Sequence, residues 1–450
     1  MATSALYFSK LYLENIKCFR GQHGLDLSDG QGRPAQWTVI LGNNNMGKTT
    51  VLRALADLEP VLLRSFSDLN EENRYVPTSF LRNPSLSLME TFGPYLLEPE
   101  NEWPEVSEYS FFIGCDFLRG NIRQKPDFEI LKSSYNSANF PSNAFFGFSA
   151  VDFSKRKIGE LEPMGLIGYG THRIASSASL SEGSSKELLT SSADSLFNPR
   201  HRLLNVESWL LQLDYREKSE NLTASNELKK VLTLLTSSVF PDVEQIAFET
   251  RGTTSPFVKV RTHSGWSRLR DLGYGYRASI AWIGDLAKRL FDRYPDSENP
   301  FHEPAVVLVD ELDLHLHPEW QRKIISFLSE QFPAIQWIVT AHSPLLVQSA
   351  DQINLVLLEK DGDGVSIRQP QIGSYQGWSV EEILQELMGL GERTHSDRFL
   401  KLMEQFNSGL DQNDFQASKT AYDELMQLLH PSSVHRRILT MQIESMEPIA

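Results

Sequence analysis

The chain combines segments of alternating apolar and polar residues with three nearly continuous apolar runs. Alternation over residues 6–13 and again at 25–27 predicts two half-buried strands. The apolar runs cover residues 37–41, 305–309 and 335–339. Such runs are typical of parallel strands that are covered on both faces. We therefore expect a sheet core flanked by helices.

The segments between these runs differ in character. Residues 60–165 are rich in Pro, Asn, Phe and Ser with weak periodicity, which indicates an insertion of mixed structure, and residues 164–170 predict a further strand. The Ser-rich stretch 175–195 predicts a mobile loop. Helical patterns occupy 203–240, and strand character returns at 243–261.

From residue 379 onward the apolar spacing is helical, without a sustained heptad repeat. The pattern as a whole predicts an α/β protein: a mixed sheet with flanking helices, a helical insertion and a helical C-terminal tail. The expected regions are an N-terminal lobe, an insertion with a helical lobe, a second part of the sheet domain and a C-terminal extension, at residues 1–60, 61–240, 241–372 and 373–450.

Composition narrows the class of protein. The 450 residues are 40% hydrophobic and 22% charged, as in soluble globular proteins. No run of 18 apolar residues predicts a membrane span, and the first residues lack an export-signal pattern, so we expect a cytoplasmic protein without a membrane partner. Two cysteines allow neither a disulfide framework nor a C-x-x-C zinc site.

The net charge of −15 argues against a protein that coats nucleic acid. Short basic clusters at 155–157 and 200–202 leave local contact with DNA open, although solvated surface charge is the favoured explanation for each taken alone.

A phosphate-binding loop follows the first apolar run. The sequence from Gly42 to Thr49 fits G-x-x-x-x-G-K-[ST], and a helical pattern begins directly after it. Backbone N–H groups of such a loop point at phosphate oxygens, and the helix N-terminus favours anions. Lys48 is predicted to reach the β- and γ-phosphates of ATP, and Thr49 to bind Mg²⁺. The predicted nucleotide-binding residues are Gly42, Asn43, Asn44, Asn45, Met46, Gly47, Lys48, Thr49 and Thr50.

The other two runs end in chemistry-bearing side chains. The run at 305–309 is followed by Asp310 and Glu311, at the sheet edge where open α/β sheets bind ligands. Asp310 is predicted to hold the Mg²⁺ shell through water, and Glu311 to polarise the attacking water. The run at 335–339 leads to His342, whose imidazole can contact the γ-phosphate.

Three further motifs have weaker implications. His315 and His317 could suggest zinc, but no further ligand accompanies them, and Pro318 at the start of a helix is the simpler explanation. A Gly-rich turn at 271–277 precedes a helical run at 278–290 and is a second possible anion-binding device. The Asp/Gly sequence at 361–364 predicts a hairpin turn.

Together these blocks resemble the ATP-binding-cassette ATPases of the RecF/SMC/OLD group. The phosphate-binding loop, the Leu-x-x-Gly-x-Arg block at 272–277, Asp310–Glu311 and His342 correspond to Walker A, signature, Walker B and switch histidine. A bacterial branch of this group, without coiled-coil arms, has similar sequence motifs. The similar segments in this chain are 11–19, 169–173, 207–210, 310–318 and 377–384. The ATPase subunit of Septu-type, retron-linked anti-phage systems is the most similar member we can name.

This resemblance implies a composite site. Two heads pair head to tail, and each ATP lies between one phosphate-binding loop and the partner's signature turn. Gly275, and with it Arg277, would then act on the γ-phosphate in trans. The family signature usually has serine where this chain has Gly273, so we expect slow hydrolysis and an ATP-gated clamp.

The resemblance also implies partners. It implies ATPase activity that controls a separate nuclease, of HNH type, on DNA. The chain shows neither an HNH pattern nor the residues of a Toprim nuclease. Two alternatives stay open at this point. One is a RecF-like DNA repair or maintenance ATPase without a nuclease, and the other is an assembly scaffold whose ATP is structural.

Overall fold

The computed structural model describes residues 5–58, 164–176, 192–219, 222–237, 240, 242–250, 255–391 and 395–446 with their side chains. Five more strands between residues 60 and 149 are described by their backbone. The predicted Ser-rich loop at 175–195 lies largely outside the described residues, as does the basic cluster at 155–157. The chain divides into two compact units, Met1–Trp378 and Ser379–Ala450.

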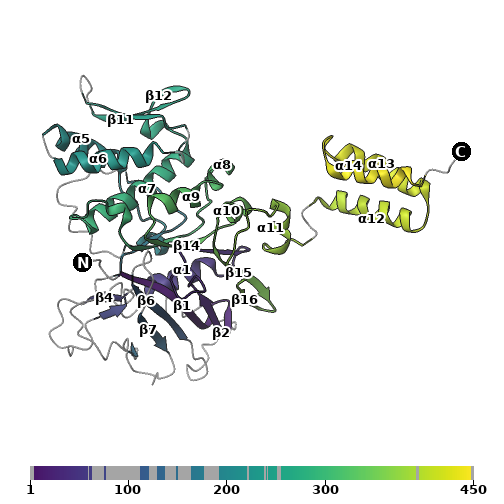
Figure 1. Ribbon diagram of the computed structural model, residues 1–450, viewed down its shortest axis with the longest axis horizontal. Helices are drawn as coiled ribbons and strands as arrows, with labels where there is room; N and C mark the ends of the chain where they lie inside the picture. Colours follow the sequence, from purple (N-terminus) through teal and green to yellow (C-terminus); the bar gives the residue numbers. More distant parts are fainter. Residues whose placement is uncertain are drawn as a thin grey trace, which may run out of the picture. The chain divides into compact units, whose positions relative to one another are not determined.

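A six-stranded sheet forms the centre of the first unit (Figure 1). Its strand order is β16-β15-β3-β14-β13-β9, and only β16 is antiparallel to its neighbour. The strands are β3 (Trp37–Gly42), β9 (Leu166–Tyr169), β13 (Ala305–Val309), β14 (Ile335–Thr340), β15 (Asn354–Asp361) and β16 (Gly364–Arg368). The three apolar runs are therefore β3, β13 and β14, and the predicted hairpin at 361–364 joins β15 to β16. The predicted α/β class and mixed sheet are confirmed.

A second, antiparallel sheet has the order β2-β1-β6-β7-β8. Its strands are β1 (Ala5–Ile16), β2 (Phe19–Asp26), β6 (Phe112–Gly120), β7 (Glu129–Asn136) and β8 (Phe148–Ser149). The two half-buried strands predicted at the start of the chain are thus β1 and β2. The described part of the predicted insertion contributes strands to this sheet, a separate hairpin of β4 (Pro60–Leu62) and β5 (Tyr75–Pro77), and β9 of the central sheet.

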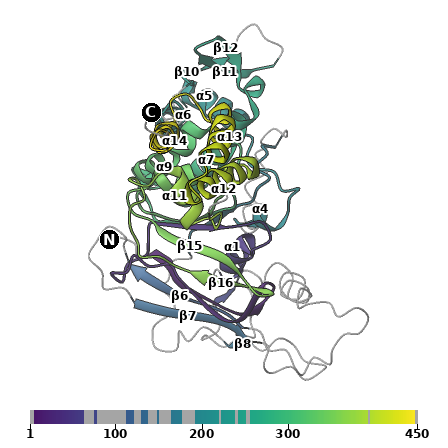
Figure 2. The ribbon, with the colours of Figure 1, turned by 90° about the vertical axis from the view of Figure 1, so that its right-hand side faces the viewer.

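Helix α1 (Lys48–Asp57) lies between the two sheets (Figures 1 and 2). Its apolar residues share one buried cluster with residues of β1, β3, β13, β14 and β15. A polar contact also joins the sheets, because Gln336 of β14 bonds both the N–H and the carbonyl of Phe8 at 2.9 and 2.8 Å. This contact satisfies both the oxygen and the nitrogen of the fully buried Gln336 side-chain amide.

Helices cover the other face of the central sheet. Trp337 points away from Gln336 on the same strand, stacks on Trp37 at 5.2 Å between ring centroids and contacts Phe332 after α9. Tyr169 meets Trp282 of α7. The described helices and 3₁₀ turns of this unit after α1 are α4 (Asp194–Phe197), α5 (Val206–Lys218), α6 (Leu222–Leu235), η4 (Leu269–Asp271), α7 (Tyr274–Arg293), η5 (Pro300–His302), α8 (Pro318–Gln321), α9 (Ile324–Gln331) and α10 (Pro344–Gln348).

A three-stranded antiparallel sheet precedes α7. It consists of β10 (Gln245–Glu249), β11 (Phe257–Thr262) and β12 (Gly265–Arg268). After η4, Gly273 is the N-cap of α7, so the helix begins at Tyr274. The prediction of a helical run that begins at Ala278 was therefore four residues late, because Gly275 lies inside the first turn rather than in a loop.

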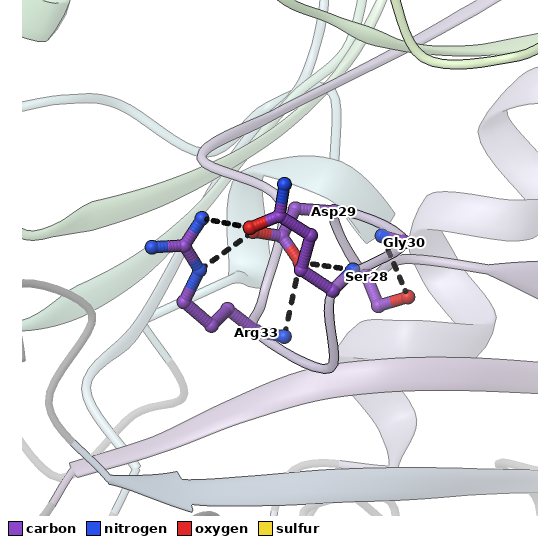
Figure 3. A network of polar contacts seen from close by, with 5 residues as sticks. Ser28, Asp29, Gly30 and Arg33 are labelled. Atoms are coloured by element: carbon purple, nitrogen blue, oxygen red, sulfur yellow. Dashed lines mark hydrogen bonds and ion pairs between the residues drawn. The ribbon is translucent and has the colours of Figure 1, made fainter. Parts of the chain in front are cut away.

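The turn before β3 is fixed by one carboxylate (Figure 3). Asp29 accepts from the backbone N–H of Gln31 and Arg33, at 2.8 and 3.0 Å, and from Nε of Arg33 at 2.7 Å. Side chains that bond nearby backbone N–H groups stabilise tight turns. This turn sets the path of the chain into β3 and hence into the phosphate-binding loop.

The second unit is helical, as predicted. It contains α11 (Val380–Glu386), α12 (Asp397–Asp411), α13 (Phe415–Leu428) and α14 (Val434–Glu444). Helix α11 begins with a capping box between Ser379 and Glu382, and the other helices enclose a small core around Phe406 and Leu425. In the described part of the chain, no helix is both long and apolar enough to cross a membrane.

Candidate functional site

The sheet order brings four chain segments to one edge. Strands β3, β14, β13 and β9 are parallel neighbours, so their carboxyl ends lie side by side. The phosphate-binding loop follows β3, His342 follows β14, Asp310 and Glu311 follow β13, and residues 170–173 follow β9. Ligands of open α/β sheets bind at such an edge.

The phosphate-binding loop depends on the two glycines of its motif. Gly47 has φ +87°, and a Cβ there would lie 2.6 Å from Sγ of Cys18 and 2.7 Å from the ring of Phe19. A Cβ at Gly42 would lie 2.9 Å from the carbonyl of Leu358 on β15. The backbone can therefore take this path only without side chains at both positions.

Lys48 curls back over the loop. Its Nζ donates to the carbonyls of Gly42 and Asn43 at 2.7 and 3.0 Å. Burial lowers the pKa of Lys48 below the usual 10.5, while Asp310, Glu311 and Asp313 oppose this shift. An ammonium held on backbone carbonyls can turn to phosphate oxygens without further unfolding of the loop.

Two oxygen ligands suited to Mg²⁺ meet beside Lys48. The Thr49 hydroxyl donates to Oδ2 of Asp310 at 2.8 Å. A hydroxyl and a carboxylate are the hard oxygen donors that Mg²⁺ accepts, usually with several retained waters. The residues therefore fit a magnesium ion, which Thr49 and Asp310 would hold.

Thr340, at the end of β14, joins the two carboxylate residues. Its buried hydroxyl donates to Oδ1 of Asp310 at 2.7 Å and accepts from the backbone N–H of Glu311 at 2.7 Å. Glu311 has φ +50°, a left-handed conformation that costs a non-glycine residue about 1–3 kcal/mol. The hydrogen bonds around Glu311 maintain this conformation.

His342 is held by a third carboxylate. Its backbone N–H donates to Oδ2 of Asp313 at 3.0 Å. Two buried atoms in this pair, Nε2 of His342 and Oδ1 of Asp313, have no hydrogen-bond partner within the described ranges. Buried polar atoms usually have partners, so this imidazole is suited to phosphate or water, and the carboxylate oxygen to a hydrogen-bond donor such as water.

The His-x-His segment has structural contacts. His317 is the N-cap of α8, its Nδ1 accepts from the N–H of Glu319 at 3.4 Å, and Pro318 occupies the first turn. His315 has φ +66° and meets the ring of Tyr274 edge-on at 4.7 Å. The prediction that Pro318 starts a helix is confirmed.

The predicted signature residues Gly275 and Arg277 lie in the first turn of α7, and Gly273 is its N-cap. A Cβ at Gly275 would lie 2.5 Å from the carbonyl of His315, so the first turn of α7 packs directly on the loop after Glu311. Arg277 lies over the Tyr274 ring at 5.9 Å. Gly273 has open space around it. The contacts described for these residues are not with residues 42–50.

Sequence reasoning assigned no role to three residues of this cluster, namely Arg173, Asp313 and Thr340. Their contacts cross between strands that are far apart in the sequence. The available signals were that Arg173 and Asp313 lie in the segments 169–173 and 310–318, which resemble the bacterial branch, and that Thr340 ends the apolar strand before His342.

Comparison with known proteins identifies a family and several relatives. Residues 37–348 match the family described as "AAA domain, putative AbiEii toxin, Type IV TA system". Septu protein PtuA of Bacillus thuringiensis is 36% identical over 189 residues, which cover 41% of this chain and 48% of that protein. Septu protein PtuA of Bacillus mycoides is 26% identical over 380 residues, which cover 84% and 44%. The chain thus spans about half the length of these two relatives.

The probable ATPase of retron Vc95 from Vibrio cholerae is 24% identical over 427 residues, covering 85% of this chain and 80% of that protein. Among solved structures, the SMC head domain from Thermotoga maritima aligns with a TM-score of 0.38 and 15% identity, over 81% of this chain and 98% of that one. The family match extends from β3 to the end of α10 and includes every residue of the carboxylate cluster. Since it covers more than half of the chain, this protein belongs to that AAA-domain family.

Proposed function

We propose that this protein is the ATPase subunit of a bacterial anti-phage defence complex. The observation that carries the proposal is the single cluster formed by Lys48, Thr49, Asp310, Glu311 and His342. The relatives of the chain include Septu proteins and a probable retron ATPase, which supports the proposed role in anti-phage defence.

In the proposed reaction, the backbone of the phosphate-binding loop and Lys48 hold the phosphates of ATP. Bound Mg²⁺ would neutralise charge on the β- and γ-oxygens, with Thr49 and Asp310 as the residues that hold it. Glu311 accepts a proton from the attacking water, and His342 contacts the γ-phosphate. Phosphoryl transfer depends mainly on such positioning and charge neutralisation.

The site becomes complete through a second copy of the chain. Gly275 lies at the N-terminus of the 20-residue helix α7, where free backbone N–H groups favour an anion. Because its described contacts are not with the phosphate loop of its own chain, it is available to the ATP of a partner head, with Arg277 beside it. ATP binding then joins two heads, and hydrolysis separates them.

The proposed output is control of a separate nuclease of HNH type on DNA, in the cytoplasm. The absence of serine at Gly273 supports slow hydrolysis, since no side-chain hydroxyl is available there for the partner's γ-phosphate. A slow ATPase keeps the assembled state for longer, which suits a clamp.

The test is the mass of the protein in solution by size-exclusion chromatography with light scattering. Glu311→Gln removes the proton acceptor but keeps the shape, so we expect Mg-ATP to shift this variant fully to a dimer or larger assembly. Wild type should shift partly with ATP and not with ADP. An identical mass for both proteins under all nucleotide conditions would contradict the proposal.

The partner is tested separately. Co-expression with a neighbouring HNH gene should give co-elution that depends on nucleotide state. If the heads assemble with ATP but neither bind a nuclease nor change its cleavage of DNA, the proposed control of a nuclease would be wrong and only the proposed ATPase activity would remain.

A further inference from the structure

Arg173 occupies an unusual place beside the carboxylates. It lies in the segment that leaves the sheet after β9, next to the strand that carries Asp310 and Glu311. Two contacts fix this segment: the N–H of Gly170 donates to the hydroxyl of Ser195 at 3.0 Å, and that hydroxyl donates to the carbonyl of Gly168 at 2.8 Å. A Cβ at Gly170 would lie 2.2 Å from the carbonyl of Ser195, so no larger residue fits this path.

The guanidinium of Arg173 points at the backbone of the carboxylate pair. Its Nη2 donates to the carbonyl of Asp310 at 3.1 Å and to the carbonyl of Glu311. The residue is only 5% exposed. These bonds go to main-chain oxygens rather than to carboxylates, so the carboxylates of both residues stay available for magnesium and water.

Glu311 is therefore held from both sides. Thr340 binds its N–H, and Arg173 binds its carbonyl. A left-handed non-glycine residue persists only where its surroundings over-determine it. Because the backbone angles limit which side-chain rotamers are allowed, this pair of contacts restricts the directions open to the Glu311 carboxylate.

The charge of Arg173 supports the same role. Burial lowers the pKa of Arg173 to about 10, while Asp310, Asp313 and Glu311 oppose the shift. The guanidinium is thus charged at neutral pH. A buried charge costs several kcal/mol of desolvation, which surrounding hydrogen bonds and opposite charges must offset.

We propose that Arg173 is a positioning residue of the ATPase site, which fixes the backbone turn at Glu311 so that its carboxylate faces the attacking water. This inference rests on the proposed ATPase function. Arg173 has no described contact with residues 42–50. Its loss should therefore slow the chemical step and leave nucleotide binding nearly unchanged.

The experiment compares Arg173→Gln and Arg173→Lys with wild type, each alone and combined with Glu311→Gln. We expect Arg173→Gln to lower kcat at least about tenfold, with the Kd for a fluorescent ATP analogue within about threefold. Arg173→Lys should retain an intermediate rate, because its ammonium keeps the charge but is shorter and lacks the planar fork. Arg322→Gln, the same change at an exposed position outside the basic clusters, should leave both quantities unaltered.

The double variants give the decisive comparison. If Arg173 acts through Glu311, its substitution causes no further loss of rate in the Glu311→Gln background, because groups that act as one unit are not additive. A further tenfold loss in that background, or a change in ATP affinity with kcat unaltered, would overturn the proposal.

Hydrogen exchange supplies a readout that does not depend on hydrolysis. The peptide that covers residues 305–316 should exchange faster in Arg173→Gln and, less so, in Arg173→Lys. Unchanged exchange in both variants would overturn the proposed backbone clamp. If wild type hydrolysed no ATP, the proposed function would fail, whereas the exchange result would still decide whether Arg173 holds the turn.

Discussion

Replacing Thr340 with valine tests the carboxylate cluster most directly. Valine has nearly the same shape, so the substitution removes the hydroxyl and leaves the packing of the fully buried site intact. Two hydrogen bonds are lost, one to the carboxylate of Asp310 and one from the N–H of Glu311, each 2.7 Å long.

The expected cost follows from these bonds. A hydrogen bond to a charged group contributes about 1.5–3 kcal/mol, and an N–H left buried without a partner costs about 1–3 kcal/mol. Asp310 keeps its bond from Thr49, so we expect the lower part of the combined range, about 3 kcal/mol. Thr340→Ser keeps the hydroxyl and loses one methyl group, which should cost only about 1 kcal/mol.

Urea unfolding followed by tryptophan fluorescence measures this cost for the relevant part of the chain. All tryptophans lie in Met1–Trp378, so the signal reports on that unit alone. Phosphate release then measures turnover, which we expect to fall at least about tenfold in Thr340→Val because Glu311 loses one of its two backbone anchors.

A buried threonine outside the site provides the control. Thr38 of β3 is also fully buried, and its hydroxyl accepts from Nδ2 of Asn354 at 3.2 Å. Thr38→Val should lose some stability but keep its turnover. The reasoning is refuted if Thr340→Val unfolds at the wild-type urea concentration with unaltered turnover, or if Thr38→Val loses as much activity.

Other variants test the signature turn and the phosphate loop. Gly273→Ser should raise turnover about tenfold or more, because a hydrogen bond from the serine hydroxyl to a phosphate oxygen contributes about 1.5–3 kcal/mol. A Cβ at this position has no neighbour within 4 Å, so the serine fits. Phosphate release that stays at the wild-type rate would contradict this prediction. Gly275→Ala should abolish ATP-dependent assembly, because its Cβ would lie 2.5 Å from the carbonyl of His315, whereas Gly273→Ala should assemble normally by light scattering. Burial lowers the pKa of Lys48 below 10.5, and only the charged ammonium attracts phosphate. Lys48 is fully charged at pH values below this lowered pKa, so ATP affinity should begin to fall with rising pH before pH 10.5 is reached. In Lys48→Arg the affinity, although weaker, should stay constant over pH 7–10, and a wild-type affinity equally constant to pH 10 would argue against this role.

Much of the fold could be predicted because its signals are local. The runs at β3, β13 and β14, the hairpin after β15 and the helical C-terminal region were all correctly predicted from patterns within a few residues. The phosphate-binding loop is equally local, since its strand, glycines and helix start are neighbours in the chain. The catalytic roles of Glu311 and His342 stay predictions.

The start of α7 shows where local reasoning failed. Gly273 and Gly275 lie close together in the sequence and predict a turn, because glycine weakens helices. In the structure Gly275 is inside the helix, because only a residue without a side chain allows the helix to lie against the carbonyl of His315. The reason for this glycine is a contact with a segment 40 residues away, and no local pattern contains it.

The sequence by itself thus predicted which residues would bind phosphate and magnesium, since each motif carries its own backbone conformation and donor atoms. Only the tertiary structure decided that β9 lies beside β13, that Arg173 and Thr340 hold Glu311 from opposite sides, and that Asp313 holds His342. The physical reason is that strand order depends on which edges pair and how helices cover them, and these choices are made by the whole core at once. Side chains that act across neighbouring strands become visible only after those choices have been made.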